Sequence, residues 1–293
     1  MNDKRVIGVD LGGTKILAGI VEPDGTIGPT VERPTVTSCQ AALFDELVAT
    51  VQSLPQDGVA AIGFGIPSRI DHRNGIALGA VNIPIRDAPF RDEMESRLGL
   101  PIGMENDGTC AAYAEFTLGA GRGVDSLVML TLGTGVGGGV ICDGRLFRAW
   151  TELGHVVIVE DGEPCQGSCS GHGHVEAYCS GTAADKLART VLGPGATARD
   201  LVAQRHESLG SIGRHLGVAI GSFVNIFGAQ RAVVGGGFGI AAFELLVPAA
   251  RQAVLAEALA PSGQTLEIVA AELGSRAGLI GAALVGRDAL ALA

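Results

Sequence analysis

Cysteine, histidine and carboxylate side chains concentrate in one short stretch of a chain otherwise dominated by Ala, Gly, Val and Leu. These residues are Glu152, His155, Cys165, Cys169, His174 and Glu176. The Cys-x3-Cys-x4-His run lies in a loop rich in Gly and Ser and has the ligand spacing of a tetrahedral zinc site. With His155 it forms a Cys2His2 set, and a closed site of this kind is structural. The pattern therefore predicts a zinc ion that pins a loop beside a site for a polar ligand.

Two alternatives remain open for this stretch. His172 competes with His174 as a ligand, whereas Cys179 lies too far into the next predicted helix. Cys165 and Cys169 could also be two buried free cysteines, because free cysteine often packs as a small hydrophobe.

Two turns that contain glycine and threonine follow strand-like segments. Asp10–Lys15 reads DLGGTK, and Thr131–Gly138 reads TLGTGVGG. Glycine lets the backbone approach an anion closely, turn N–H groups cradle phosphate oxygens, and threonine hydroxyls add donors. Either turn alone could be an ordinary hairpin, but two at equivalent places of a repeat indicate a phosphate clamp. The predicted phosphate contacts are Gly12, Gly13, Thr14, Lys15, Gly133, Thr134 and Gly135. Asp10 would hold Mg²⁺, directly or through water.

Two glycine runs raise the question of a nucleotide base. Gly133–Gly138 matches the dinucleotide fingerprint GxGxxG, which must lead from a strand into a helix. Here the chain continues as strand and hairpin through Gly144, so the context excludes a Rossmann site. Gly235–Gly237 does lie between a predicted strand and a helix. Gly236 and Gly237 could admit an adenine or a nucleotide sugar, or form an ordinary tight turn.

A possible general base precedes the helix predicted at 109–117. Asn106 and Asp107 are both favoured N-cap types, and Asp107 could instead accept a proton from a hydroxyl group. Glu115, on the same helix, is predicted to be solvated or ion-paired at the surface.

Alternating strand and helix patterns must position these groups. Strands are expected at 6–10, 15–22, 59–66, 102–105, 126–131, 138–142, 231–234 and 265–270, with a third hairpin strand after 23–25 and a loop at 70–71. Helices are expected at 42–54, 91–98, 109–117, 174–192, 208–227, from 241, and at 277–290, with a hinge at 119–123. A strand, a Gly/Thr turn, a strand and an Asp-Gly turn occur twice, offset by about 120 residues. This weak repeat predicts two similar α/β domains facing a cleft, where small ligands usually bind.

Composition narrows the class of protein. The 293 residues are 47% hydrophobic and 18% charged, which describes a soluble globular chain with room for two domains. A net charge of −10 argues against nucleic acid as a partner. No apolar run approaches the roughly 20 residues of a membrane span, and strand-like sequence begins at Val6 without a signal peptide. Six scattered cysteines indicate the reducing cytosol.

Taken together, these motifs resemble the ROK family (repressors, open reading frames, kinases) of the actin-like ATPase superfamily, and specifically its bacterial glucokinases. The matching segments, in order, are the phosphate motifs 10–15 and 132–138, the sugar-side loop 65–71, the catalytic Glu-Asn-Asp 105–107, the signature from 152–155 to Glu176, and the adenosine motif 234–237. The resemblance implies two ribonuclease H-like (actin-like ATPase) domains. The first would span 1–118 and be completed by the C-terminal helix 277–293, and the second would span 119–276.

The resemblance also implies roles for individual residues. Asp107 would deprotonate the sugar 6-hydroxyl for attack on the γ-phosphate of ATP. The implied sugar contacts are Asn82, Asn106, Asp107, Glu152, His155 and Glu176. His155 would use one ring nitrogen for the sugar and the other for zinc, which links the metal to substrate orientation. Domain closure would align the transfer. We expect a homodimer or homotetramer that binds sugar and nucleotide, and the composition above predicts a cytoplasmic protein without nucleic acid or membrane as a partner.

Three departures from the family pattern stand out, of which the first bears on the zinc site and the last on the choice of sugar. His174 stands where the family has a third cysteine, Ser68 replaces a glycine, and the loop 145–151 is shorter than usual. An ATP- and Mg²⁺-dependent glucokinase with structural zinc is the leading hypothesis. The alternatives are a kinase for fructose, mannose, allose or an N-acetylhexosamine, a sugar sensor without activity, and a nucleotide-dependent oxidoreductase. The phosphate turns do not distinguish ATP from polyphosphate. The first strand at Val6 leaves no room for the helix-turn-helix domain of repressor members.

Overall fold

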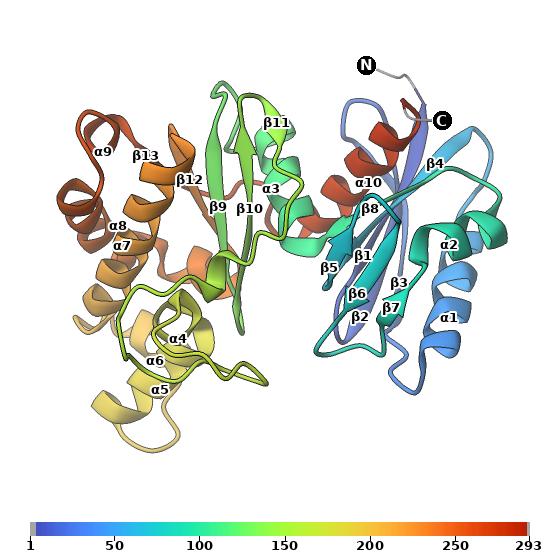
Figure 1. Ribbon diagram of the computed structural model, residues 1–293. Helices are drawn as coiled ribbons and strands as arrows, with labels where there is room; N and C mark the ends of the chain where they lie inside the picture. The colour runs from blue at the N-terminus through green and yellow to red at the C-terminus, as the bar shows by residue number, and fades with distance from the viewer. Residues whose placement is uncertain (1–3, 292–293) are drawn as a thin grey trace. The chain divides into compact units, whose positions relative to one another are not determined.

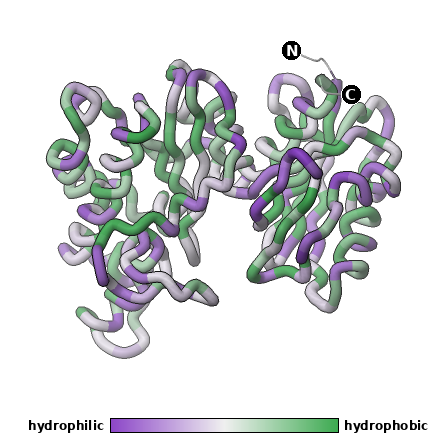
Figure 2. Tube along the Cα trace, viewed as in Figure 1, coloured by the Kyte–Doolittle hydropathy of each residue, from purple (hydrophilic) through white to green (hydrophobic). Residues whose placement is uncertain are grey.

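The computed structural model describes residues 4–291, and its contacts divide the chain into two compact units (Figure 1). The first unit comprises Met1–Ala114 and Ser275–Ala293, and the second comprises Glu115–Gly274. Hydrophobic residues recur along the strands and helices of both units (Figure 2). Each unit therefore has its own apolar core.

A five-stranded sheet forms the centre of the first unit, in the order β3-β2-β1-β4-β8. Its strands are β1 (Arg5–Leu11), β2 (Lys15–Val21), β3 (Ile27–Pro34), β4 (Val59–Ile66) and β8 (Ile102–Asn106). β1, β2 and β3 pair antiparallel, whereas β1, β4 and β8 are parallel. The helices α1 (Gln40–Gln52) and α2 (Phe90–Leu98) add their apolar side chains to the same core.

The second unit repeats this arrangement, with the order β11-β10-β9-β12-β13. Its strands are β9 (Leu127–Leu132), β10 (Val136–Cys142), β11 (Arg145–Leu146), β12 (Arg231–Gly235) and β13 (Glu267–Ala270). Antiparallel strands again lie on one side of the first strand and parallel strands on the other. The internal repeat predicted from the sequence is confirmed. Asp10 and Thr131 occupy equivalent positions, each directly before the last residue of its strand.

Glycines explain why the C-terminal helix α10 (Ala277–Ala289) completes the first unit. Gly8, Gly63 and Gly103 pair in one row across β1, β4 and β8. A Cβ atom at any of them would clash with backbone atoms of α10. The helix therefore lies directly on the backbone of the sheet, which only glycine permits. The end of the predicted segment 277–293 falls at 292–293, outside the described residues.

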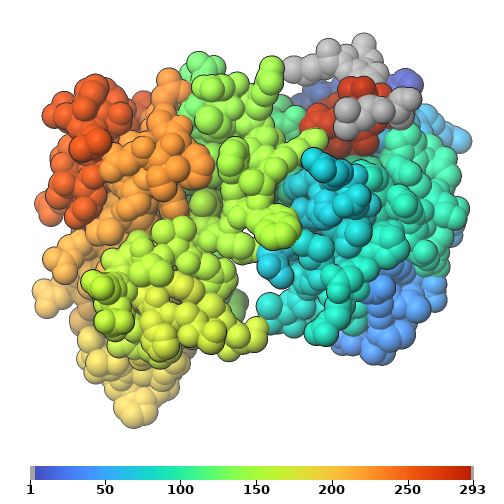
Figure 3. Space-filling view, in the orientation of Figure 1, coloured from blue at the N-terminus to red at the C-terminus, as the bar shows by residue number. Residues whose placement is uncertain are grey.

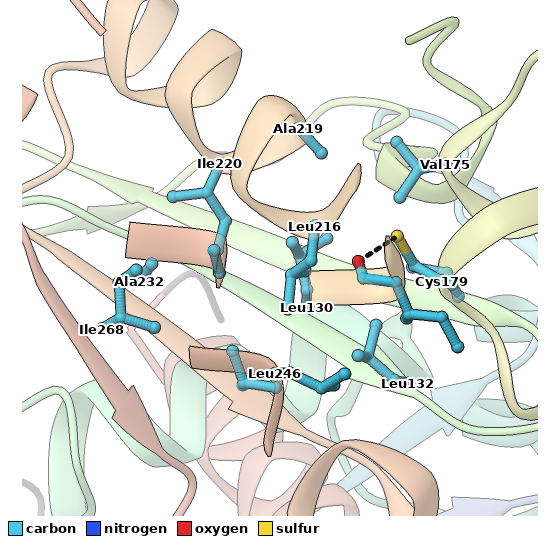
Figure 4. Packing of buried hydrophobic residues seen from close by; sticks show 14 of the residues in the cluster. Leu130, Leu132, Val175, Cys179, Leu216, Ala219, Ile220, Ala232, Leu246 and Ile268 are labelled. Atoms are coloured by element: carbon cyan, nitrogen blue, oxygen red, sulfur yellow. Dashed lines mark hydrogen bonds between the residues drawn. The ribbon is translucent and has the colours of Figure 1, made fainter. Parts of the chain in front are cut away.

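Helices α7 (Leu209–Phe227) and α8 (Gly237–Glu257) pack into the core of the second unit. Figure 4 shows Leu216 and Ile220 of α7 and Leu246 of α8 among the strand residues of this core. By length and composition alone α8 could cross a membrane, although charged residues interrupt its apolar sequence. Its buried residues Ala242, Leu246, Ala250 and Val254 belong to the core cluster. A core helix accounts for this pattern.

Several short elements differ from the sequence prediction. A separate sheet of β5 (Arg69–Asp71), β6 (Ile76–Gly79) and β7 (Arg86–Ala88) replaces the loop predicted at 70–71, because such short strands show no periodicity. The helix predicted at 174–192 is broken at Ser180 into α4 (Val175–Cys179) and α5 (Gly181–Leu192). The Ser180 hydroxyl caps α5 by accepting the N–H of Ala183 at 3.0 Å. The sequence reading missed α6 (Ala198–Ala203), and α9 (Ser262–Thr265) occupies the start of the strand predicted at 265–270.

Glu115 is buried, although the sequence predicted it to lie at the surface. It lies on α3 (Asp107–Leu118) and its exposed fraction is 0%. Its carboxylate accepts backbone N–H groups of Ala120 at 2.9 Å, Glu272 at 3.1 Å and Leu273 at 2.8 Å. The prediction is wrong because the chain folds back over the carboxylate, and these N–H groups replace water as its partners.

Candidate functional site

The two turns predicted to bind phosphate are named the first and second phosphate turns, and the first connects β1 to β2. The N–H of Gly12 donates to the carbonyl oxygen of Lys15 at 2.9 Å and closes the turn. Burial raises the pKa of Asp10 to about 6, and the carboxylate of Asp107 makes the next largest contribution to this increase. The charge of Lys15 lowers the pKa of Asp10 by a smaller amount. A buried carboxylate whose pKa is raised in this way is suited to a divalent cation, which would restore the ionised form of Asp10.

The predicted base lies at the junction of β8 and α3. Asn106 acts as the N-cap, because its Oδ1 accepts the N–H of Thr109 at 3.2 Å. Asp107 is the first residue of the helix and accepts the N–H of Gly108 at 2.8 Å. The amide nitrogen of Asn106 donates to the carbonyl oxygen of Ser68 at 3.4 Å. The capping alternative therefore holds for Asn106, whereas the carboxylate of Asp107 acts on that of Asp10.

Asn82 lies in the connection between β6 and β7, and it packs against the first phosphate turn. A Cβ atom at Gly13 would lie 3.1 Å from the Cβ atom of Asn82. Asn82 therefore lies beside the first phosphate turn, which begins two residues after Asp10 in the sequence.

Sequence reasoning missed a pair formed by the half-buried His72 and the buried Glu105. The Nε2 atom of His72 lies 2.7 Å from Oε2 of Glu105, and Oε1 of Glu105 accepts the N–H of Asn106 at 2.9 Å. Glu105 is buried, with an exposed fraction of 2%. A glutamate in an otherwise apolar strand was the available signal, because a buried charge requires partners. No sequence pattern singles out His72 as that partner.

The second phosphate turn connects β9 to β10. The N–H of Gly133 donates to the carbonyl oxygen of Gly135 at 2.9 Å. Oε2 of Glu176 accepts the N–H of Val136 at 2.8 Å, and a Cβ atom at Gly135 would clash with this carboxylate. Glu176, predicted as a sugar contact, therefore also holds the phosphate turn.

Four predicted metal ligands come together in one cluster. The ligand atoms of His155, Cys165, Cys169 and His174 all lie within 4.8 Å of one another. The alternative ligand His172 is exposed and is not a member of the cluster. The segment that carries these residues, in yellow-green, lies at the surface of the second unit (Figure 3).

The distances within the cluster can be compared with those of a tetrahedral ion. The two Nδ1 atoms of His155 and His174 are 3.3 Å apart. Cys165 Sγ is 3.6 Å from His155 Nδ1, and Cys169 Sγ is 3.6 Å from His174 Nδ1. Zinc with Zn–N of about 2.0–2.1 Å and Zn–S of about 2.3 Å separates two nitrogens by about 3.3 Å and nitrogen from sulfur by about 3.6 Å. The donor set therefore fits tetrahedral zinc.

Ionisation of the ligands also bears on metal binding. Burial raises the pKa of the Cys165 thiol to about 11. Burial, and next the ring of His155, lower the pKa of His174. The histidine is thus ready to coordinate as the neutral ring, while the thiol must release its proton when a metal binds.

The remaining predicted residues lie in the second unit. Glu152 is exposed and precedes the short helix η1 (Leu153–His155). Gly236 has a φ of +79°, and a Cβ atom there would clash with the backbone of Leu132, so the strand-to-helix turn requires glycine. A Cβ atom at Gly237 would meet nothing within 4 Å. This geometry is compatible with an adenine contact and with an ordinary turn.

The comparisons with known proteins agree with this arrangement. The model of the ROK family matches residues 6–289. The chain belongs to the ROK family. A glucokinase from Streptomyces coelicolor is 30% identical to this ROK chain, over 96% of this chain and 97% of the relative.

Two solved structures show the fold of this ROK protein. A ROK family glucokinase from Streptomyces griseus, in complex with glucose and AMPPNP, is 31% identical with a TM-score of 0.81, covering 97% of this chain and 99% of that one. A ROK hexokinase from Thermus thermophilus is also 31% identical, with a TM-score of 0.85 and coverage of 99% and 100%. The predicted α/β class with two ribonuclease H-like (actin-like ATPase) domains is confirmed.

Proposed function

We propose that this ROK protein is a glucokinase, which transfers the γ-phosphoryl group of ATP to the 6-hydroxyl of glucose. The observation that carries the proposal is that Asp107 begins α3 and that its carboxylate is near enough to Asp10 to raise the pKa of the Asp10 carboxyl. Two phosphate turns at equivalent places in the two units and the glucokinase relatives support it.

Asp107 is proposed as the general base that accepts the proton of the sugar 6-hydroxyl. The proposed sugar contacts are Asn82, Asn106, Asp107, Glu152, His155 and Glu176. The N–H groups of the turns at Gly12–Lys15 and Gly133–Gly135 are proposed to hold the phosphates, with Gly236 and Gly237 at the adenosine. Phosphoryl transfer needs little covalent chemistry from the protein, so positioning and charge neutralisation supply most of the rate.

Two metal ions belong to the proposal. Asp10 would hold Mg²⁺, which neutralises charge on the phosphates. His155, Cys165, Cys169 and His174 would hold a structural Zn²⁺, and the cluster distances support this assignment. We further propose a cytoplasmic protein that forms a homodimer or homotetramer, which light scattering of the purified protein tests.

The first alternative keeps the chemistry and changes the sugar to fructose, mannose, allose or an N-acetylhexosamine. The short loop before Glu152 and Ser68 in the sugar-side loop keep this alternative open. A sensor without activity is disfavoured, because Asp107 and both phosphate turns are intact.

A coupled assay of ADP release across a panel of hexoses tests the function, with polyphosphate as a second donor. Glucose is expected to give the highest kcat/KM. The variant Asp107→Ala should lose about 10²- to 10⁴-fold in kcat, the usual contribution of general base catalysis. Asp24→Ala is the matched control, because that exposed carboxylate only caps a turn at the N–H of Thr26. A parent protein that binds a hexose tightly but phosphorylates none is a sensor and not a kinase. Near-parental kcat in Asp107→Ala would refute the assignment of the base.

A further inference from the structure

Each phosphate turn is held from outside by the hydroxyl group of one threonine. In the first unit, Thr35 Oγ1 donates to the carbonyl oxygen of Gly12 at 2.7 Å. In the second unit, Thr182 Oγ1 donates to the carbonyl oxygen of Thr134 at 2.8 Å. Both threonines lie outside the turns, and neither belongs to the phosphate motifs read from the sequence.

A backbone N–H group at or next to each threonine donates to a second carbonyl group of the same turn. The N–H of Thr35 donates to the carbonyl oxygen of Thr14 at 3.0 Å, and the N–H of Gly181 donates to that of Gly133 at 2.7 Å. Each turn thus has two of its carbonyl groups held by donors from a neighbouring segment. The sequences of the two units differ here, yet in each unit a threonine hydroxyl and a backbone N–H group donate to two carbonyl groups of equivalent turns.

Holding a carbonyl group also fixes the N–H group of the next residue. The peptide unit is planar and trans, so its C=O and N–H bonds point in opposite directions. The hydroxyl of Thr35 therefore orients the N–H of Gly13, and that of Thr182 orients the N–H of Gly135. Within residues 4–291, no hydrogen bond takes up either N–H group. Both point away from the threonine that holds their peptide and are available to an anion.

We propose that Thr35 and Thr182 are positioning residues, which orient the N–H groups of Gly13 and Gly135 toward the phosphates of the nucleotide. The inference rests on the proposed function, since it assumes that the turns bind ATP. A preoriented N–H group needs no reorganisation when the anion binds, whereas a free turn must first fix its peptide planes. The threonines themselves touch only the turns.

Binding of Mg²⁺ and adenylyl imidodiphosphate, measured by titration calorimetry, tests the proposal. Thr35→Val and Thr182→Val keep the shape of the side chain and remove the donor. Each is expected to weaken nucleotide binding about fivefold, or about 1 kcal/mol at 1.4 kcal/mol per tenfold. Thr35→Ser and Thr182→Ser retain the hydroxyl and should bind within twofold of the parent. The KM for ATP should follow these changes, while the KM for glucose should stay constant.

Thr190→Val is the matched control. Thr190 lies on α5, as does Thr182, but its hydroxyl donates to the carbonyl oxygen of Lys186 in the same helix. It should leave nucleotide binding unchanged. Parental nucleotide affinity in both threonine-to-valine variants overturns the inference while leaving the kinase assignment intact. A parent protein that binds the nucleotide but transfers phosphate to no hexose overturns the kinase assignment alone, because the calorimetry still compares the variants.

Discussion

The side chain of Glu115 and the backbone of Leu273 are joined by a hydrogen bond of 2.8 Å, although 158 residues separate them in sequence. The same carboxylate accepts the N–H groups of Ala120 and Glu272. The chain passes between the two units next to Glu115 and again after Gly274. One buried side chain therefore ties together the two segments of the second unit that lead into the first.

Glu115→Gln is expected to destabilise the second unit by about 2–4 kcal/mol. The new amide group must turn its NH2 toward at least one backbone N–H group, which leaves buried donors unpaired. The fluorescence of Trp150 during urea denaturation measures the effect, since it is the only tryptophan and belongs to this unit. Glu272→Ala is the control, because its exposed carboxylate makes only a 4.0 Å ion pair with Arg122 and should change stability by less than about 1 kcal/mol. Equal effects of the two substitutions would contradict the special role of Glu115.

The stability of the first unit should depend on pH through Asp10. The pKa of this carboxyl rises from 3.8 to about 6 in the folded chain. An acid with a raised folded pKa contributes stability that is fully present below about pH 4 and is lost as the pH rises through 6. The loss is about 3 kcal/mol, at about 1.4 kcal/mol for each pKa unit. Urea denaturation from pH 4 to pH 7 without Mg²⁺ measures it.

Asp10→Asn is the reference for this titration, because its side chain does not ionise. The unfolding free energy of the parent should fall relative to that of Asp10→Asn as the pH rises. A difference that stays constant from pH 4 to pH 7 would show that the pKa of Asp10 is not raised.

Features set by residues close together in the sequence were predicted, whereas contacts between residues far apart in the sequence were not. Glycine and threonine turns next to apolar strands are local signals, and they correctly predicted the repeated hairpins and the position of Asp10 near the end of β1. The spacing of Cys165, Cys169 and His174 likewise predicted a cluster that the structure brings together. Glu115 was misplaced because its partners at 272–273 are remote in sequence, and a helix pattern does not show which turn will cover a side chain.

The pairing of His72 with Glu105 escaped prediction for the same reason. The two residues are 33 positions apart, and His72 follows a strand of three residues that has no periodicity of its own. Burial of Glu105 required a partner, but only the fold decides which side chain reaches it.

His72→Ala should destabilise the first unit by about 1–3 kcal/mol, because Glu105 loses one partner of its buried carboxylate. It should also raise the KM for glucose more than the KM for ATP. The small sheet that carries the Asn82 loop is tied through His72 to β8, which leads into Asp107. His72→Gln retains a donor and should recover part of the loss. Arg73→Ala, a neighbouring exposed residue, is the control, and equal KM values for glucose in His72→Ala and the parent would contradict the prediction.

The cluster in the second unit should retain about one zinc per chain after purification. His174→Ala should lose the metal, whereas His172→Ala should keep it, since only His174 lies within the cluster. Elemental analysis gives the metal content, and limited proteolysis reports the order of the loop. Removal of zinc by a chelator should expose the segment 156–173 to protease, because the ion replaces a hydrophobic core as the link between the ligands. A purified protein without metal, or equal retention by the two histidine variants, would refute the four-ligand site.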